Sequence, residues 1–176
     1  EVPATVRTIG AFAFEHCPAI YSMSVASGNS CYDSSDSCNA IIETATGTLV
    51  AGCMNTVIPA TVTSIGDNAF SGCFMLTSLS IPKSVTSLGN YAFAECTSLS
   101  SIDIPFSVTY IGDAAFSGCS ALKTLDIPNS VSSLGQAAFG GCSSLESINL
   151  PKSVSSISDF EFYGCTLLKA INIPGT

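Results

Sequence analysis

The feature that most constrains this chain is a period of 23 residues. Prolines recur at that step, and cysteines and phenylalanines keep the same step at other positions of the unit. The three columns are Pro59, Pro82, Pro105, Pro128, Pro151 and Pro174; Cys73, Cys96, Cys119, Cys142 and Cys165; and Phe70, Phe93, Phe116, Phe139 and Phe162. Because three residue types share one period, the sequence predicts a repeat protein whose units stack on one another.

Each unit contains a short segment in which apolar residues alternate with small polar ones, as in Leu99-Ser-Ser-Ile102-Asp-Ile104. This alternation is typical of a half-buried strand, and equivalent strands stacked about 4.8 Å apart form a parallel sheet. The proline that follows ends the strand because it has no N–H to donate. A glycine column then allows a close turn. The Ala-Phe pair after it is expected in a short helical turn, with the phenylalanine filling the core between coils.

The predicted fold class is an α/β repeat solenoid, right-handed, with a parallel β-sheet on the concave face and short strands or helical turns on the other side. Residues 1–176 are expected to form a single solenoid domain of about seven units, and the chain is expected to be a fragment because both ends lie inside the pattern. The second unit is longer, at 33 residues, because Phe14 and Cys17 match the later columns at an offset of 56. Its extra material is expected to form an insert with a hairpin near residues 26–58, projecting from one face.

The repeat beginning at Ile81 reads Ile81-Pro82-Lys-Ser-Val85-Thr-Ser-Leu88-Gly89-Asn-Tyr-Ala92-Phe93-Ala-Glu-Cys96-Thr-Ser-Leu99. It resembles the BspA-like leucine-rich repeats, which have 23-residue repeats and are of the cell-surface type. The resemblance covers almost the whole chain. It implies a leucine-rich-repeat fold, a location at the cell surface or outside the cell of a host-associated bacterium or a protist, and a link to adhesion. It offers no catalytic residue to carry over.

Composition excludes several classes of partner. Only 10% of the residues are charged and the mean hydropathy is +0.48, yet no stretch approaches the roughly 18 consecutive apolar residues of a spanning helix. We therefore expect no membrane insertion. The net charge is −8, and the five basic residues are dispersed rather than clustered. Binding to nucleic acid is not expected, because a basic surface is needed to neutralise phosphates.

The outward positions of successive strands are the candidate ligand-binding residues. They are small and polar and include an Asp/Asn column, without an aromatic side chain among them: Ser78, Ser80, Ser101, Asp103, Thr124, Asp126, Ser147, Asn149 and Asn172. Such a strip either keeps an exposed sheet soluble or forms hydrogen bonds with a ligand. A protein ligand, from the extracellular matrix or from a host or bacterial surface, is favoured over a glycan, because glycan sites usually contain aromatic platforms.

The insert supplies a second candidate contact site, with Tyr32, Asp33 and Asp36 in a polar loop. Two carboxylates are too few for calcium, which takes six or more ligands, so a solvated loop is expected. Cys31 and Cys38 are a candidate disulfide pair if the protein is exported, and two unpaired thiols are the alternative. Six cysteines, Cys17 included, share one column and are expected to be buried free thiols rather than disulfides or zinc ligands.

The sequence gives no reason to expect an enzyme, a metal or another cofactor. His16 is the only histidine, and no nucleophile or carboxylate partner for it can be named from the sequence. The predicted function is a cell-surface or secreted binding or adhesion module that recognises a protein, or less favourably a glycan, through the solenoid surface. The alternative is a passive structural spacer that presents other domains.

Overall fold

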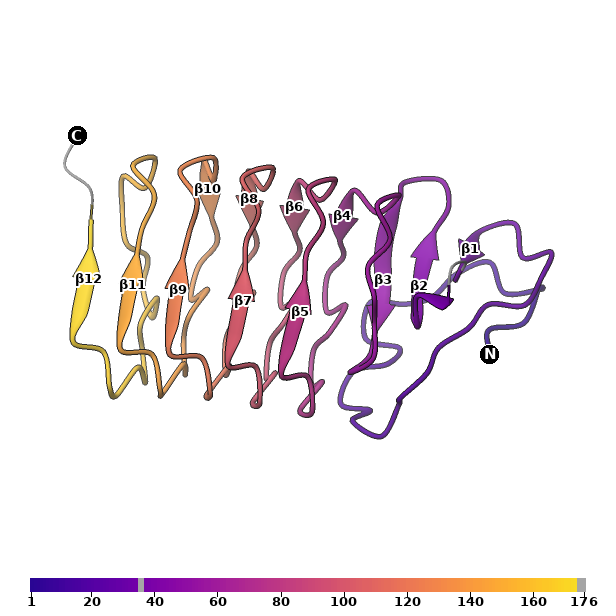
Figure 1. The fold of residues 1–176 in the computed structure, drawn as a ribbon, viewed down its shortest axis with the longest axis horizontal. Helices are drawn as coiled ribbons and strands as arrows, with labels where there is room; N and C mark the ends of the chain where they lie inside the picture. The colour runs from indigo at the N-terminus through magenta and orange to yellow at the C-terminus, as the bar shows by residue number, and fades with distance from the viewer. Residues whose placement is uncertain (35–36, 174–176) are drawn as a thin grey trace.

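The computed structural model describes residues 1–34 and 37–173. The chain winds into coils that lie side by side along the long axis of the molecule, with the two termini at opposite ends (Figure 1). From residue 78 onward each coil carries one strand on the front of this view, and several carry a second, shorter strand behind it. The molecule is therefore a β-solenoid.

Twelve strands occur in the described residues, and most have two or three residues. Their bounds are β1 Tyr32–Asp33, β2 Ala40–Glu43, β3 Thr48–Gly52, β4 Ser64–Ile65, β5 Ser78–Ser80, β6 Ser87–Leu88, β7 Ser101–Asp103, β8 Tyr110–Ile111, β9 Thr124–Asp126, β10 Ser133–Leu134, β11 Ser147–Asn149 and β12 Ala170–Asn172. Strands of this length cannot be stable alone, so each depends on the coils beside it.

The strands form two walls. The back wall is one sheet of order β1-β2-β3-β4-β6-β8-β10, parallel from β3 onward. The front wall consists of two parallel sheets, β5-β7 and β9-β11-β12. Partners in the front wall are always 23 residues apart, as in Leu79 with Ile102 and Leu125 with Ile148. The repeat period therefore sets the strand register.

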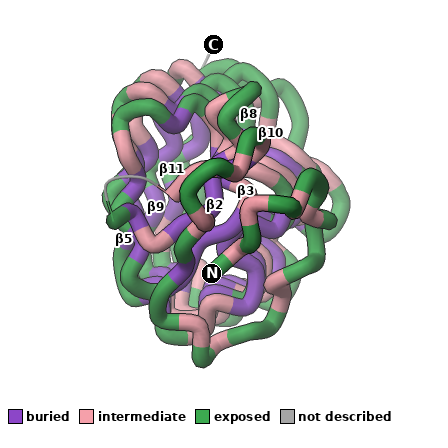
Figure 2. Tube along the Cα trace, turned by 90° about the vertical axis from the view of Figure 1, so that its right-hand side faces the viewer, coloured by how far each residue is buried: buried purple, intermediate pink, exposed green. Residues whose placement is uncertain are grey.

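The core between the walls is built from residues that stack on the equivalent residues of the neighbouring coils. Phe70, Phe93, Phe116 and Phe139 are fully buried, and consecutive rings of the column, which continues to Phe162, stack with centroids 5.3–6.1 Å apart. Figure 2 shows buried segments lining the interior and exposed segments on the outside. The prediction that phenylalanine fills the core between coils is confirmed.

The segment around each phenylalanine is a series of hydrogen-bonded turns, so the helical turns expected there, and with them the α/β class, are not confirmed; α-helix is absent from residues 1–34 and 37–173. One residue of each turn has a left-handed backbone. Asn68, Tyr91, Ala114, Ala137 and Phe160 have φ between 49° and 61°. A left-handed residue reverses the chain direction and prevents a right-handed helix from continuing.

Polar side chains join each coil to the next. The backbone N–H of Asn90 donates to Asp67 Oδ1 at 2.7 Å, that of Asp113 to Asn90 Oδ1 at 2.9 Å, and that of Gln136 to Asp113 Oδ1 at 2.8 Å. The glycine before each of these residues allows the approach. A Cβ on Gly112 would lie 2.6 Å from the backbone nitrogen of Asn90. Two of the three acceptors, Asp67 and Asp113, are carboxylates, so these charges bind the backbone of the neighbouring coil instead of forming ion pairs.

The long unit near the N-terminus does not project as an insert, contrary to our expectation. Strands β2 and β3 pair antiparallel around the turn at residues 44–47, and β3 then pairs parallel with β4. The hairpin thus continues the back wall. Leu49 and Ala40 are completely buried in the main core, while Tyr32 and Ile41 belong to a second, smaller core cluster with the N-terminal coil.

Candidate binding surface

The outward side chains of the front wall lie on one face, as the strand alternation predicts. Of the nine candidate residues, eight are exposed and Ser147 is half-buried, while the residues between them point into the core. This strand face is defined by Ser78, Ser80, Ser101, Asp103, Thr124, Asp126, Ser147, Asn149 and Asn172. Its side chains carry hydroxyl, carboxylate and amide groups, and the strands that bear them, β5, β7, β9, β11 and β12, lie along the front of Figure 1.

The strand face is interrupted between β7 and β9, where the two front sheets end. Asp103 and Asp126 occupy equivalent positions on these neighbouring strands. Elsewhere in the same column an aspartate lies beside a neutral residue. Asn149, for example, donates from Nδ2 to Asp126 Oδ1. Like charges on directly opposed strand positions are destabilising, which gives a physical reason for the interruption at this aspartate pair.

A hollow of about 390 Å³ lies at the interruption, lined by both aspartates and by Phe106, Thr124 and Asn129. Phe106 is 82% exposed. The nine outward strand residues include no aromatic side chain, but Phe106 borders the same face. Phe106 was missed because it follows Pro105, outside the alternating segment. Comparison of the repeats could have identified Phe106 as an exception, because the equivalent residues are Ala60, Lys83, Asn129 and Lys152.

The hollow continues along the face, because a second depression of about 270 Å³ is lined by Ser78, Ser80, Ser101 and Asp103. Six of the nine candidate residues thus line adjoining hollows over β5, β7 and β9. Ser147, Asn149 and Asn172 extend the same face over β11 and β12 without lining either hollow.

The second candidate site, in the long unit, is not an exposed loop where the structure describes it. Tyr32 is 6% exposed, and its hydroxyl accepts a hydrogen bond from the N–H of Ile9 at 2.9 Å. It therefore packs the N-terminal coil onto β1 instead of presenting an aromatic contact. Asp33 is half-buried and pairs with Ile42 through the β1–β2 ladder. Asp36 lies outside the described residues.

No disulfide joins Cys31 to Cys38 in the structure. Cys38 is buried in the main core, and its thiol donates to the carbonyl oxygen of Ala40 at 3.6 Å. Cys31 packs against the smaller N-terminal cluster instead. The two side chains belong to different parts of the interior, which is why they do not pair.

The cysteine column is a ladder of thiol hydrogen bonds. From Cys96 to Cys165 each Sγ donates to a phenylalanine carbonyl of an earlier coil, as in Cys96 to Phe70 and Cys119 to Phe93, both at 3.1 Å, whereas Cys73 donates to the carbonyl oxygen of Gly52 at 3.7 Å. Burial raises the pKa of Cys142 to about 12 and that of Cys119 well above its ordinary value. Because the thiolate is the reactive and metal-binding form, these thiols act as packing groups. Cys17, at the N-terminal end of the column, is exposed, contrary to our expectation.

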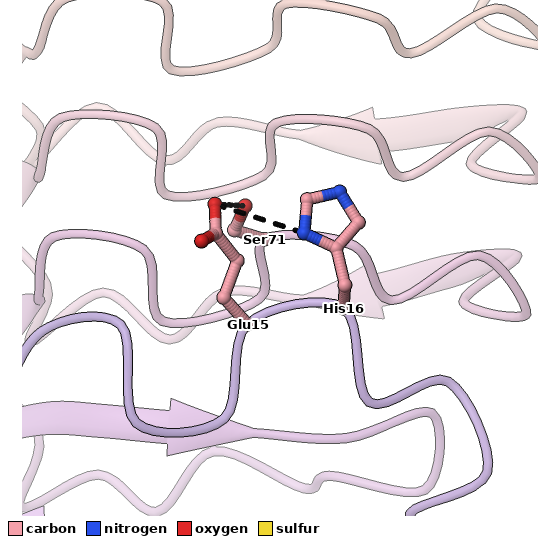
Figure 3. A network of polar contacts seen from close by, with 3 residues as sticks. All are labelled: Glu15, His16 and Ser71. Atoms are coloured by element: carbon pink, nitrogen blue, oxygen red, sulfur yellow. Dashed lines mark hydrogen bonds and ion pairs between the residues drawn. The ribbon is translucent and has the colours of Figure 1, made fainter.

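Ser71, Glu15 and His16 are the residue types of a catalytic triad, but they do not contact one another in the order that a triad requires. Ser71 donates to Glu15 Oε1 at 3.4 Å, and His16 Nδ1 lies 3.8 Å from the same oxygen (Figure 3). The carboxylate therefore lies between the serine and the histidine. A histidine base must itself contact the hydroxyl that it deprotonates, with the carboxylate behind it. His16 instead packs against Phe74, with ring centroids 5.8 Å apart.

Glu161 occupies the position that is alanine in the preceding coils, at Ala69, Ala92, Ala115 and Ala138. It is only 3% exposed. Its Oε2 accepts a hydrogen bond from Ser158 at 2.5 Å, whereas Oε1 is buried without a hydrogen-bond partner among the described residues. Burial raises the pKa of this carboxyl above its usual value.

Residues 1–34 and 37–173 contain no group of three or more His, Cys, Asp or Glu side chains that could hold a metal ion. No helix in this part of the chain has the length and apolar character needed to cross a membrane.

Comparison with known proteins gives a family match and several similar structures. Residues 63–176 match the family described as BspA type leucine rich repeat region, in six copies. No curated protein matches the chain. The chain is 32% identical, with a TM-score of 0.85, to a leucine-rich cell surface protein from Faecalibacterium prausnitzii, and the match covers 99% of this chain and 47% of that one.

Two other solved structures are similar. The pneumococcal vaccine antigen PcpA has a TM-score of 0.84 at 23% identity, over 99% of this chain and 45% of that one, which shows a shared fold. A leucine-rich repeat protein from T. pallidum has a TM-score of 0.57 at 28% identity, over 80% of this chain and 78% of that one. This chain spans about half the length of the first two proteins.

Proposed function

Because the chain belongs to the BspA-type leucine-rich repeat family, we propose that it is a binding module of a cell-surface or secreted protein and recognises a protein ligand through its strand face. Proteins of this repeat family are commonly surface proteins, and leucine-rich repeats generally mediate protein interactions. The Faecalibacterium relative is described as a cell surface protein. The solenoid fold is typically a non-catalytic scaffold, and no enzyme was found among the similar proteins.

The observation that carries the proposal is the hollow at the β7–β9 interruption. It combines two carboxylates, from Asp103 and Asp126, with the exposed ring of Phe106 in one open depression. Carboxylates bind ammonium and guanidinium groups through charge-assisted hydrogen bonds, and an aromatic face attracts the same cations. The hollow therefore suits a lysine or arginine side chain of the ligand, and the flanking hydroxyls suit its backbone.

The charge of the whole chain supports a basic partner. With 13 acidic and five basic residues, the protein attracts a positively charged surface over a distance set by the salt concentration. Such attraction raises the association rate, while the close contacts at Asp103, Asp126 and Phe106 set the dissociation rate.

The test is a binding screen of the purified chain against immobilised fibronectin, laminin, collagen and fibrinogen and against intact bacterial cells. We expect saturable binding to at least one of them, weakened about tenfold or more in the Asp103→Asn/Asp126→Asn double variant, and weakened by added salt. The matched control is Asp159→Asn, which removes an exposed carboxylate away from the strand face.

Two outcomes of this screen would contradict the proposal. Binding that survives unchanged in the double variant would contradict a role for the strand face. If the chain shows no saturable binding to any member of the panel, the alternative function, a passive spacer that presents other domains, is favoured.

A further inference from the structure

A second surface lies on the turns, among residues that the strand face does not include. It is a shelf of about 290 Å³ that crosses four successive coils. We call it the turn shelf, and its residues are Glu95, Ser117, Gly118, Ala137, Gly140, Gly141, Phe160 and Tyr163. An aromatic pair bounds one end, glycines and alanine form the floor, and a carboxylate lies at the other end.

The aromatic end is unusual for this protein. Phe160 is 70% exposed and Tyr163 is 72% exposed, and their ring centroids lie 6.1 Å apart in an edge-to-face arrangement. In the two preceding coils the place of Phe160 is taken by Ala114 and Ala137. These small neighbours leave the shelf side of the aromatic pair uncovered.

The opposite end holds a carboxylate at a position where the neighbouring coils have glycine. Glu95 is equivalent to Gly72, Gly118 and Gly141, and it takes the same left-handed backbone, with φ of 57°. This conformation suits glycine and is unfavourable for glutamate. Glu95 is exposed and makes no ion pair within the described residues. The backbone N–H of Glu95 donates to the carbonyl oxygen of Ser117 at 2.7 Å, as in the glycine-containing turns, so the repeat imposes the conformation while the carboxylate stays outside any ion pair.

The floor between the two ends is shaped by the absence of side chains. A Cβ on Gly118 would lie 2.5 Å from Glu95 Oε1, so the carboxylate rests where only glycine leaves room. A Cβ on Gly140 would lie 3.4 Å from the carbonyl oxygen of Phe160. The floor is thus open backbone, flanked by the hydroxyl of Ser117, and it offers a flat bed with hydrogen-bonding groups at the edge.

From this arrangement we propose that the turn shelf binds a carbohydrate, with a hexopyranose ring packed against Phe160 and Tyr163 and its hydroxyls bonded to Glu95 and Ser117. A sugar ring presents a face of C–H groups that packs on an aromatic ring and an edge of hydroxyls that donate to a carboxylate. Membrane lipid is a poorer fit, because a carboxylate lies on the shelf and the net charge is −8.

The experiment titrates the ¹⁵N-labelled chain with methyl β-glucopyranoside, methyl β-galactopyranoside and methyl α-mannopyranoside, and with cyclohexanol as an apolar ring that lacks the array of hydroxyls. We expect at least one glycoside to give saturable shifts of the amide signals of Gly118, Gly140 and Gly141. Cyclohexanol is expected to give none. Absence of saturable shifts with all three glycosides, or equal shifts with cyclohexanol, would overturn the proposal.

Two variants test the residues, and each has a control. Phe160→Ala is expected to weaken binding about tenfold or more, whereas Tyr91→Ala, at the equivalent position of the coil that carries Glu95 but not among the residues that line the shelf, leaves it unchanged. Glu95→Gly restores the glycine of the column and relieves the left-handed strain, so this variant should be at least as stable as the wild type while losing about tenfold in affinity. Retained affinity in Phe160→Ala or Glu95→Gly would overturn the assignment.

Glycoside binding at the turn shelf does not involve the residues of the strand face. Asp103→Asn/Asp126→Asn is expected to leave the glycoside affinity unchanged. Failure of the protein-binding proposal and failure of this one are therefore distinguishable.

Discussion

The N-terminal coil and the regular coils that follow it differ in how their columns are packed. From Phe70 to Phe139 each phenylalanine has a copy of itself in a neighbouring coil and is fully buried. Phe14 holds the equivalent place in the first coil but is only half-buried, and Cys17 is exposed. The first coil packs instead on the smaller cluster around Tyr32.

This difference shows that residues placed at the repeat positions are not buried by the 23-residue period alone. A column residue is buried when the coil beside it has the same turn geometry, which the long unit between Cys17 and Cys73 does not provide. Where the columns are continuous, the core is made entirely by inward positions. The outward positions are then free to carry other chemistry, which is where Phe106, Glu95 and the aspartates lie.

The largest expected effect is on the phenylalanine column. Phe116→Ala should lower the free energy of unfolding by about 3–5 kcal/mol, because it removes a fully buried ring that is stacked on both sides. Urea denaturation measures the change. Phe106→Ala is the control: its ring is 82% exposed, so we expect a change within about 0.5 kcal/mol. Similar losses in the two variants would contradict the comparison.

The glycine column provides a more specific test, because Gly10 and Gly112 are equivalent positions in the two regions. A Cβ on Gly112 would meet the backbone of Asn90 at 2.6 Å, whereas a Cβ on Gly10 would meet no atom within 4 Å. Gly112→Ala should cost about 1–3 kcal/mol, and Gly10→Ala should be neutral or slightly stabilising. Denaturation of both variants measures this, and equal costs would show that the N-terminal coil is packed as tightly as the others.

The smallest effect concerns Glu161, where the alanine column is broken at the other end. Its pKa is raised by burial, so the folded state binds the proton more tightly than the unfolded state. Ionisation of Glu161 therefore lowers the stability of the folded state as the pH rises above about 4.5, the ordinary pKa of a glutamate, and through the raised pKa. Glu161→Ala should stabilise the chain by about 0.5–2 kcal/mol at pH 7.

Measurement of the unfolding free energy of Glu161→Ala across pH tests the sign. The gain at neutral pH should shrink as the pH falls below about 4.5, where the glutamate is protonated in both states. Asp159→Ala, which removes an exposed acid two residues away, is the control for the loss of one negative charge. A gain that grows toward acid pH would mean that Glu161 is stabilised as the anion.

Much of this fold could be predicted, because the 23-residue period records which residues stack. The parallel strands, the phenylalanine core and the outward strip follow from the alternation around positions such as Ile102. The turns could not be predicted in the same way. Left-handed residues such as Ala114 and Ala137 carry no compositional signal, and an Ala-Phe pair is equally compatible with a helical turn.

The candidate sites were less predictable because they depend on departures from the repeat. The hollow arises where two aspartates happen to be neighbours, and its aromatic wall lies beyond the alternating segment. Tyr32 looked exposed in a polar sequence, yet its hydroxyl is used to hold the N-terminal coil. A column-by-column search for unusual residues would have found Phe106, Glu95 and Phe160, because each differs in type from the residues above and below it.

The central claim is that the core is made by the inward columns while the strand face serves recognition. The most direct test measures unfolding free energy and ligand binding on the same Asp103→Asn/Asp126→Asn protein. We predict that stability is unchanged or slightly increased, because the like charges are removed, while affinity for the protein ligand falls about tenfold or more. A stability loss above about 1 kcal/mol, or unchanged affinity, would contradict the account.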